Sequence, residues 1–288
     1  MILSGYSYDN MGPHLKFCNI DLGKHHKQYL NKECLNIRKL DRRYCIGLYD
    51  LSALSYKSCP YKNKLELGSK INNCSDCYSK IGFNPAFYNT KKISPQQLEY
   101  NKKNHVVYLA YFSPSHIKVG IASEKRAELR LFEQGARAAF ILKTLPNAYL
   151  ARELEHKICH GEYGVLERLL SEQKTNIFCN TKYDSEVALK TLNETLKSID
   201  IPPESSFLEF DSKYFNGNIY DFENLENIKS PEYLSGETVG MIGDAVMLKQ
   251  NDTFFLVSIK KFISYEIEID HSKNFIKYEI AAKQISLW

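Results

Sequence analysis

The sequence contains no run of about 18 apolar residues, the length that a transmembrane helix requires, and this argues against a helical membrane span. The first ten residues include Tyr6, Tyr8, Asp9 and Asn10, so they lack the apolar stretch of a secretory signal peptide. Internal repeats and low-complexity tracts are missing as well. We therefore expect a soluble cytoplasmic protein without a membrane partner, and its 288 residues suffice for about two or three compact units.

Charge is distributed unevenly along the chain. Residues 1–105 hold 17 Lys and Arg against 8 Asp and Glu, whereas residues 201–288 hold 8 against 14. A basic N-terminal region favours a polyanionic partner such as nucleic acid, although a solvated lysine-rich surface gives the same excess of basic residues. Nucleic acid is therefore the expected partner, while the oligomeric state stays open.

Cysteine is concentrated at the front, where six of the eight cysteines precede residue 78. In a reducing compartment, clustered cysteines more often bind metal than form disulfides. The spacing Cys45-x13-Cys59-x14-Cys74-x2-Cys77 has one close pair and two upstream thiols, which predicts a closed structural zinc site. Two alternatives remain: an iron–sulfur cluster, or a site in which Cys45 and Cys59 are merely small core residues. Each of the other four cysteines is expected to be a buried free thiol.

Turn residues and hydrophobic patterns divide the chain into three predicted units of an α+β protein. Residues 1–95 have short strands and loops and form a zinc-bound loop/β module, because loop-rich chain needs a tether. Residues 96–200 form a small α+β domain. Residues 201–288 follow a proline pair and form a small antiparallel β domain for which the sequence indicates no chemistry.

The middle unit has the most regular pattern. VVYLAYF and IKVGIA predict a β-hairpin, and residues 124–134 predict a helix that Ser123 caps and Gly135 ends. Residues 138–145 predict a strand and residues 147–158 another helix. Strand, strand, helix, strand, helix is a compact α+β arrangement.

An ordered series of motifs runs through this unit: His105-Val-Val-Tyr108-Leu-Ala, Lys118-Val-Gly120, Arg130-Leu-Phe-Glu-Gln134-Gly135-Ala136, Tyr149 followed by Glu155, and Lys174-Thr175-Asn176. This series resembles an uncharacterised bacterial family of GIY-YIG-like proteins with a multi-cysteine, zinc-like segment in front. The resemblance covers about residues 40–180. It implies a GIY-YIG fold with two signature triplets on adjacent strands, an arginine on the next helix and a metal-binding glutamate on a later one.

Carried over by position, the resemblance puts Val106-Val107-Tyr108 in the first triplet and Lys118-Val119-Gly120 in the second. Arg130 is then the arginine and Glu155 the glutamate. The implied catalytic residues are Tyr108, Lys118, Arg130 and Glu155, with Glu155 holding Mg²⁺ or Mn²⁺. Substrate binding is assigned to His105, Gly120, Gln134 and Gly135.

These groups are chemically sufficient for phosphodiester hydrolysis. A phenol can orient or deprotonate water, a guanidinium can fork onto phosphate, and a carboxylate-held cation can stabilise developing charge. Each residue also has an ordinary role: Tyr108 as a core aromatic, Arg130 as a surface ion-pair partner and Glu155 as a solvated helix position. Glu153 is a competing choice for the glutamate.

Two departures from the signature limit the catalytic interpretation, since Val106 replaces glycine and Lys118 replaces tyrosine. The first hypothesis is a metal-dependent nucleic-acid-processing hydrolase with a structural zinc. The second is a non-catalytic zinc-containing DNA- or RNA-binding module on the same scaffold, which both departures favour. The third is an enzyme that acts on a smaller substrate in the same pocket.

Overall fold

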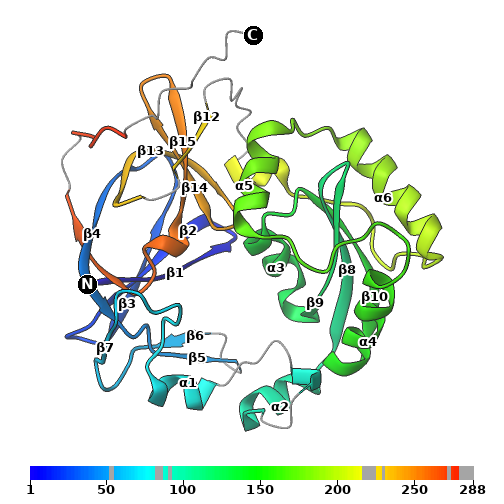
Figure 1. Ribbon diagram of the computed structural model, residues 1–288, viewed down its shortest axis with the longest axis horizontal. Helices are drawn as coiled ribbons and strands as arrows, with labels where there is room; N and C mark the ends of the chain where they lie inside the picture. Colours follow the sequence, from blue (N-terminus) through cyan, green and yellow to red (C-terminus); the bar gives the residue numbers. More distant parts are fainter. Residues whose placement is uncertain are drawn as a thin grey trace.

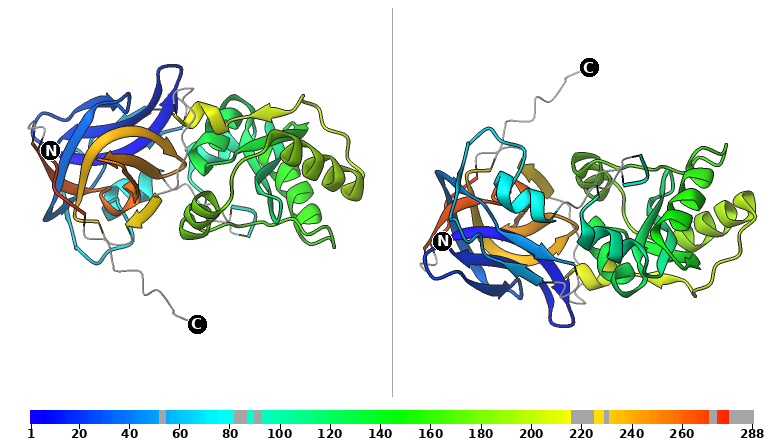
Figure 2. Two further views of the ribbon diagram at one scale, coloured as in Figure 1. Left: turned by 90° about the horizontal axis from the view of Figure 1, so that it is seen from above. Right: turned by 90° about the horizontal axis from the view of Figure 1, so that it is seen from below.

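The computed structural model describes residues 1–51, 55–81, 87–89, 93–215, 225–228, 231–270 and 274–278. Figures 1 and 2 show two lobes that lie side by side. The β lobe combines the first strands of the chain with the last ones, and the α/β lobe holds the middle of the sequence. A cysteine segment, residues 45–81, lies below the β lobe in Figure 1. None of the helices within the described ranges has the length and apolarity that a membrane crossing requires.

The β lobe is built on one ten-stranded sheet, with the path β12-β15-β14-β13-β4-β16-β1-β2-β3 and β7 paired to β4. All neighbours are antiparallel except β12 and β15. The strands are β1 (Ile2–Asp9), β2 (Gly12–Asn19), β3 (Lys24–Tyr29), β4 (Cys34–Tyr44), β7 (Lys64–Leu65), β12 (Leu225–Ile228), β13 (Tyr233–Ile242), β14 (Ala245–Gln250), β15 (Thr253–Ser258) and β16 (Tyr265–Ile269).

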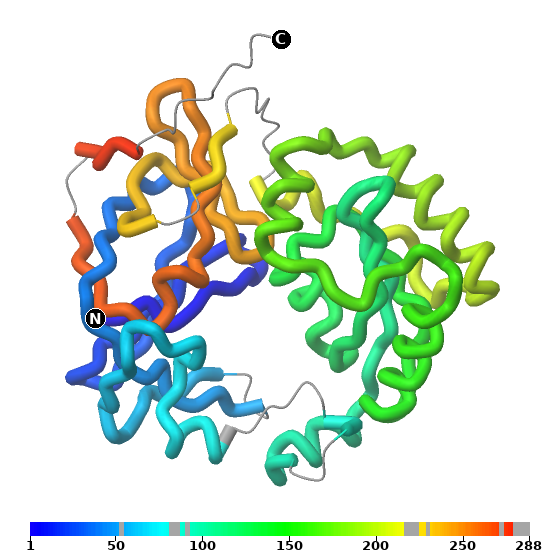
Figure 3. The backbone as a smooth tube through the Cα atoms, in the orientation of Figure 1, coloured from blue at the N-terminus to red at the C-terminus, as the bar shows by residue number. Residues whose placement is uncertain are grey.

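Strands from opposite ends of the chain meet at β4. This strand pairs with β13 on one side and with β16 on the other, and β16 also pairs with β1. The expected small antiparallel sheet of the C-terminal segment is therefore part of a larger sheet that the N-terminal strands complete. Figure 3 shows this arrangement as blue and orange tubes that run side by side.

The α/β lobe contains a four-stranded antiparallel sheet in the order β11-β10-β8-β9. Its elements are α2 (Pro95–Asn101), β8 (His105–Ser113), β9 (His116–Ser123), the 3-10 turn η2 (Glu124–Arg126), α3 (Ala127–Gln134), β10 (Ala138–Leu145), α4 (Ala148–Cys159), α5 (Ser171–Asn180), α6 (Ser185–Ile199) and β11 (Leu208–Glu209). The predicted order of strand, strand, helix, strand and helix is confirmed from β8 to α4. Gly135 ends α3 in a left-handed conformation as expected, but Ser123 makes no cap bond and pairs with Tyr100 instead.

Alternate residues of β8 pack on opposite faces of this sheet, and both faces are buried. Val107, Leu109 and Tyr111 belong to a core with α4 and α6. Tyr108 and Phe112 belong to the larger core, which continues into the β lobe. The second face of the α/β sheet therefore lies toward the lobe junction.

Two glycine turns bring the lobes into close contact. Gly135 and Gly243 both have a positive φ, and a Cβ atom on Gly135 would lie 3.3 Å from the backbone nitrogen of Gly243. Tyr8 of β1 donates to the carbonyls of Met241 and Gly243 beside this contact. Tyr214, in the 3-10 turn η3 (Asp211–Phe215), donates to the carbonyl of Ala136 from the other side. The junction is a packed interface between backbone turns.

The cysteine segment has little regular structure of its own. It contains β5 (Leu48–Asp50), β6 (Ser55–Lys57), β7 and helix α1 (Ser75–Ile81). Its β5–β6 hairpin faces the α/β lobe, where the guanidinium of Arg126 lies 5.9 Å from the ring centre of Tyr49. A fixed cysteine centre would therefore also fix this contact.

Candidate metal centre and lobe-junction cations

Four cysteine thiols meet at one point beneath the β lobe. Their sulfur atoms all lie within 4.8 Å of one another, and all four residues are buried. The Sγ of Cys59 lies 4.0 Å from that of Cys74 and 3.7 Å from that of Cys77. A tetrahedral zinc with Zn–S bonds of about 2.3 Å requires sulfur separations of roughly 3.8 Å. The cluster therefore has the donor set and spacing for a metal ion such as zinc.

The surroundings of the thiols also suit a cation. Backbone N–H groups of Gly47 and Cys74 donate to the Sγ of Cys45, as they would to a thiolate. Burial raises the pKa of Cys45 to about 11 and that of Cys77 above its usual range, whereas hydrogen bonds outweigh burial at Cys74 and lower its pKa to about 7. Cys45 lies between β4 and β5, Cys59 follows β6, Cys74 directly precedes α1 and Cys77 lies in α1, so one ion would connect the whole segment.

The other cysteines lie outside this cluster. Cys18 is a buried free thiol, as the sequence predicted. Cys34 is exposed at the start of β4, and Cys159 and Cys179 are half-buried, so the expectation of burial is wrong for Cys34. Cys34 is the first residue of β4, opposite Glu237 of β13, and its side chain lies in solvent.

Tyr108 is the centre of a buried polar contact on β8. Gly120 lies directly opposite on β9, and a Cβ atom there would approach the Tyr108 hydroxyl oxygen to 2.3 Å. Gln134 donates its side-chain amide to that hydroxyl from the last turn of α3. The ammonium of Lys118 lies 5.8 Å from the ring centre. Four predicted site residues therefore meet, but the tyrosine that would serve catalysis is only 1% exposed.

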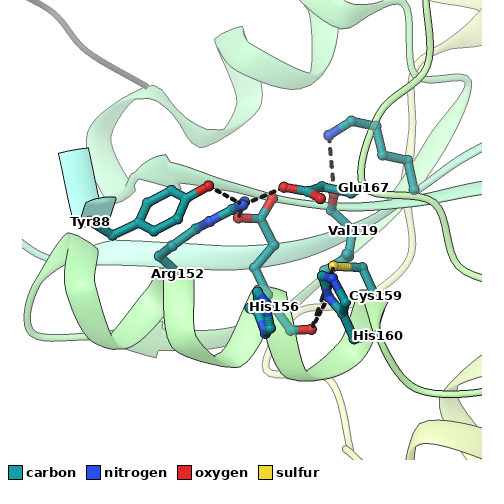
Figure 4. Close-up of polar contacts among 9 residues, drawn as sticks. Tyr88, Val119, Arg152, His156, Cys159, His160 and Glu167 are labelled. Atoms are coloured by element: carbon teal, nitrogen blue, oxygen red, sulfur yellow. Dashed lines mark hydrogen bonds and ion pairs between the residues drawn. The ribbon is translucent and has the colours of Figure 1, made fainter. Parts of the chain in front are cut away.

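Glu155 is a buried residue of α4 and belongs to a different group. Figure 4 shows Arg152, Glu167 and Tyr88 of this group. The Arg152 guanidinium pairs with the carboxylates of both Glu155 and Glu167, and it also donates to the Tyr88 hydroxyl at 2.8 Å. Burial raises the pKa of the Glu155 carboxyl, which Arg152 opposes, while the hydrogen bond from Arg152 lowers the pKa of Glu167. Glu155 is thus buried and neutralised by an internal cation.

Arg130 stands apart from both groups on the exposed side of α3. Together with Lys118, Lys174 and Lys260 it forms a set of four cations, the lobe-junction cations, from β9, α3, α5 and the 3-10 turn η4 (Ile259–Lys261). Burial lowers the pKa of Lys174 to about 7, and the positive charges of Lys260, Lys118 and Arg130 act in the same direction.

One carboxylate moderates this positive charge. Asp244, 6% exposed in the β13–β14 turn, lies 3.4 Å from the Lys260 ammonium and accepts a hydrogen bond from Ser258. Lys174, Asp244, Gln134 and Gly135 all line a small cavity at the junction. At this cavity, Lys174 of the α/β lobe therefore lies close to Asp244 of the β lobe.

The remaining predicted residues have structural surroundings. His105 is buried at the start of β8, where its Nδ1 atom lies 2.8 Å from the carbonyl oxygen of Lys103 and burial lowers its pKa. Gly135 forms the turn against Gly243. Sequence reasoning gave no role to Arg152, Glu167, Asp244 or Lys260. The i,i+3 spacing of Arg152 and Glu155 was the one signal for the first pair.

Comparison with known proteins gives one family match. A model described as "Protein of unknown function (DUF2797)" matches residues 33–267, which is most of the chain. The chain belongs to the DUF2797 family. This match runs from the start of β4 into β16, so it includes the four cysteines, the α/β lobe and the returning β strands. No curated protein and no solved structure matches significantly. None of these comparisons shows similarity to GIY-YIG nucleases.

Proposed function

We propose that this DUF2797 protein is a zinc-stabilised nucleic-acid-binding protein that uses a GIY-YIG-like α/β lobe as a binding scaffold. Zinc at the four cysteines would have a structural role, holding the β5–β6 hairpin beside the α/β lobe. The phosphate backbone of DNA or RNA would contact the lobe-junction cations.

The observation that carries this proposal is the gathering of three further cations around the buried Lys174 ammonium. Lys118, Lys174 and Arg130 come from three elements of one lobe and Lys260 from the other, while the Asp244 carboxylate favours the charged form of Lys174. Like charges held together in this way are unfavourable until an anion neutralises them. A polyanion satisfies several of them at once and releases its own counterions. The excess of Lys and Arg over Asp and Glu in residues 1–105 adds to the attraction for a polyanion.

The state of Glu155 favours binding over hydrolysis. A hydrolytic metal centre needs a carboxylate that is free to bind the ion. Here Arg152 already forms ion pairs with both Glu155 and Glu167. Outside the four cysteines, no group of three or more possible ligands gathers within the described residues. The Tyr108 hydroxyl is likewise covered.

Hydrolysis is the second candidate, because one observation supports it. Tyr108, Gly120, Lys118 and Gln134 meet on one sheet face, and the charge of Lys118 also lowers the pKa of Glu155. A phosphate bound at Lys118 would therefore lie between the two groups that the resemblance assigns to catalysis. In that case Glu155 would hold Mg²⁺ or Mn²⁺ only after Arg152 moves away.

One assay separates the two candidates. Labelled single- and double-stranded DNA and RNA are incubated with the full-length protein in Mg²⁺ or Mn²⁺, and both binding and cleavage are measured. The double variant Lys118→Gln/Arg130→Gln tests the cations, and Lys190→Gln on the exposed face of α6 is the matched charge control. Glu155→Gln tests the metal ligand.

The binding proposal expects salt-sensitive binding without cleavage, weakened about tenfold or more in the double variant and unchanged in Lys190→Gln. Metal-dependent cleavage that Glu155→Gln abolishes would instead establish hydrolysis. Absence of binding to all four nucleic acids would reject both.

A further inference from the structure

A second polar site lies in the β lobe, away from the lobe-junction cations. Strands β1, β2 and β3 and the β6 strand of the cysteine segment enclose a cavity of about 450 Å³. Ser7, His14, Lys16, His25, Lys27 and Tyr56 are among its lining residues. Such a volume is large enough for a small organic ligand.

The strand register places these basic groups on one sheet face. Lys16 of β2 lies directly opposite Lys27 of β3, and His14 lies opposite Ser7 of β1. His25 is two residues from Lys27 and therefore shares its face. Like charges directly opposite each other in an antiparallel pair destabilise the sheet, so Lys16 and Lys27 together require compensation.

Of these two lysines, only Lys27 forms an ion pair with a described residue. The Lys27 ammonium forms an ion pair with Asp9 at 2.8 Å. Lys16 is half-buried, and its ammonium lies 5.3 Å from the ring centre of Tyr56 without a hydrogen bond or ion pair to any described residue. Burial lowers the pKa of Lys16, and the charges of Glu133 and Asp9 offset this lowering only in part.

Two further polar groups beside Lys16 lack partners. His14 is 1% exposed, and its Nε2 atom has no hydrogen-bond partner among the described residues. Its Nδ1 atom lies 3.4 Å from the Gly12 carbonyl oxygen and 3.6 Å from an Asp9 carboxylate oxygen, so Nδ1 carries the hydrogen and Nε2 is an acceptor. The Ser7 side chain is buried, and its hydroxyl makes no hydrogen bond within the described part of the chain.

We infer that this cavity is a binding site for a phosphate group, in which Lys16 and Ser7 donate to phosphate oxygens and His14 Nε2 accepts a hydrogen bond from a P–OH group. A buried acceptor beside an unpaired cation calls for a ligand with both an anionic oxygen and a donor. Monoprotonated phosphate has both, whereas sulfate at neutral pH has only acceptors. The cavity exceeds the size of one phosphate, so a phosphomonoester also fits.

This inference is independent of the proposed nucleic-acid function. The sites share no lining residue, and Ser7, His14, Lys16 and Lys27 all precede the segment that matches the DUF2797 model. Phosphate binding here therefore does not require binding of DNA or RNA at the lobe junction.

Isothermal titration of the full-length protein with inorganic phosphate, glycerol phosphate and sulfate near neutral pH, at constant ionic strength, tests the site. We expect 1:1 phosphate binding that Lys16→Gln and Ser7→Ala each weaken. Loss of one charge-assisted hydrogen bond lowers affinity by about tenfold or more, so we expect Lys16→Gln to weaken phosphate binding by this factor. Lys24→Gln is the control, because Lys24 is exposed on β3 and belongs to the opposite face. Circular dichroism checks that each variant is folded.

The ligands separate the possible sources. Tighter binding of glycerol phosphate than of inorganic phosphate would identify a phosphomonoester, and the reverse order would identify free phosphate; both support the site. Equal affinity for sulfate and phosphate would contradict the role of His14. Loss of binding in Lys118→Gln/Arg130→Gln but not in Lys16→Gln would place the anion at the lobe junction and overturn the inference.

Discussion

Gly120 lies directly opposite Tyr108 across the β8–β9 pair, and the tyrosine hydroxyl occupies the space that a side chain at position 120 would need. Gln134 holds this hydroxyl from α3, and the ring is buried between α3 and the sheet. The glycine thus allows a polar aromatic group to pack inside the lobe. Its role is explained by space for Tyr108, whether or not the site acts on nucleic acid.

Replacing this glycine should therefore destabilise the fold. In Gly120→Ala the new methyl group would force Tyr108 to move, and overpacking of this kind costs about 1–3 kcal/mol. Gly68→Ala is the control, because a Cβ atom at position 68 meets nothing within 4 Å. Urea unfolding measures both variants. Equal stability of the two would mean that Tyr108 is free to rearrange.

Metal removal should unfold the cysteine segment. Elemental analysis is expected to find one zinc per chain, and a chelator or Cys77→Ser should lower Tm because the metal connects otherwise loop-rich chain. Cys34→Ser, at an exposed thiol outside the cluster, should leave metal content and Tm unchanged. Iron in place of zinc would identify a cluster instead, and a metal-free protein with unchanged Tm would reject the site.

The Arg152–Glu155 pair predicts a pH-dependent stability. Burial raises the pKa of Glu155, and Arg152 opposes this rise, so Arg152→Met should raise it further. A carboxyl with a raised folded-state pKa favours folding below its unfolded pKa and loses that contribution as pH rises through the folded pKa. We expect Arg152→Met to be about 2–3 kcal/mol less stable than wild type near pH 8 and less affected near about pH 5.

Urea unfolding across this pH range checks the prediction, with Arg152→Met/Glu155→Gln as the matched control. The second change removes the buried charge, so the double variant should lose the pH dependence. A pH-independent loss in Arg152→Met would show that the arginine acts through packing alone.

Lys174 predicts that nucleic-acid binding strengthens in mild acid. Its pKa of about 7 means that the ammonium gains its proton as pH falls from about 8 to 6, which adds positive charge at the lobe junction. Binding measured at constant ionic strength should tighten about three- to tenfold over this interval. Lys174→Gln should bind equally at both pH values, whereas Lys190→Gln should behave as wild type does. The same pH response in Lys174→Gln would assign it to another group.

Local structure followed from local sequence. The β8–β9 hairpin, the strand at residues 138–145, the stop at Gly135 and the helix at residues 147–158 were all predicted, because each depends on neighbouring residues. The pairing of β4 with β13 and β16 could not be predicted, since alternation of apolar residues specifies the buried face of a strand and not its partner. Each expected terminal unit therefore contributes strands to one sheet.

The candidate site shows the same division. A close cysteine pair with two upstream thiols predicted the metal cluster, because ligand spacing is visible in the chain. Arg152 was missed, since an arginine three residues before a glutamate usually belongs to a solvated helix face. Lys260 was missed because it reaches Lys174 from the other lobe, and only the fold brings them together.

The salt dependence of nucleic-acid binding tests the central claim most directly. For a protein that neutralises phosphates with its own cations, the logarithm of affinity falls linearly with the logarithm of salt concentration, with a slope of roughly −0.7 to −0.9 per contact. We expect a steep slope for the wild type that Lys118→Gln/Arg130→Gln reduces by about two contacts and Lys190→Gln leaves unchanged. An identical slope in all three proteins would show that nucleic acid does not bind at the lobe junction.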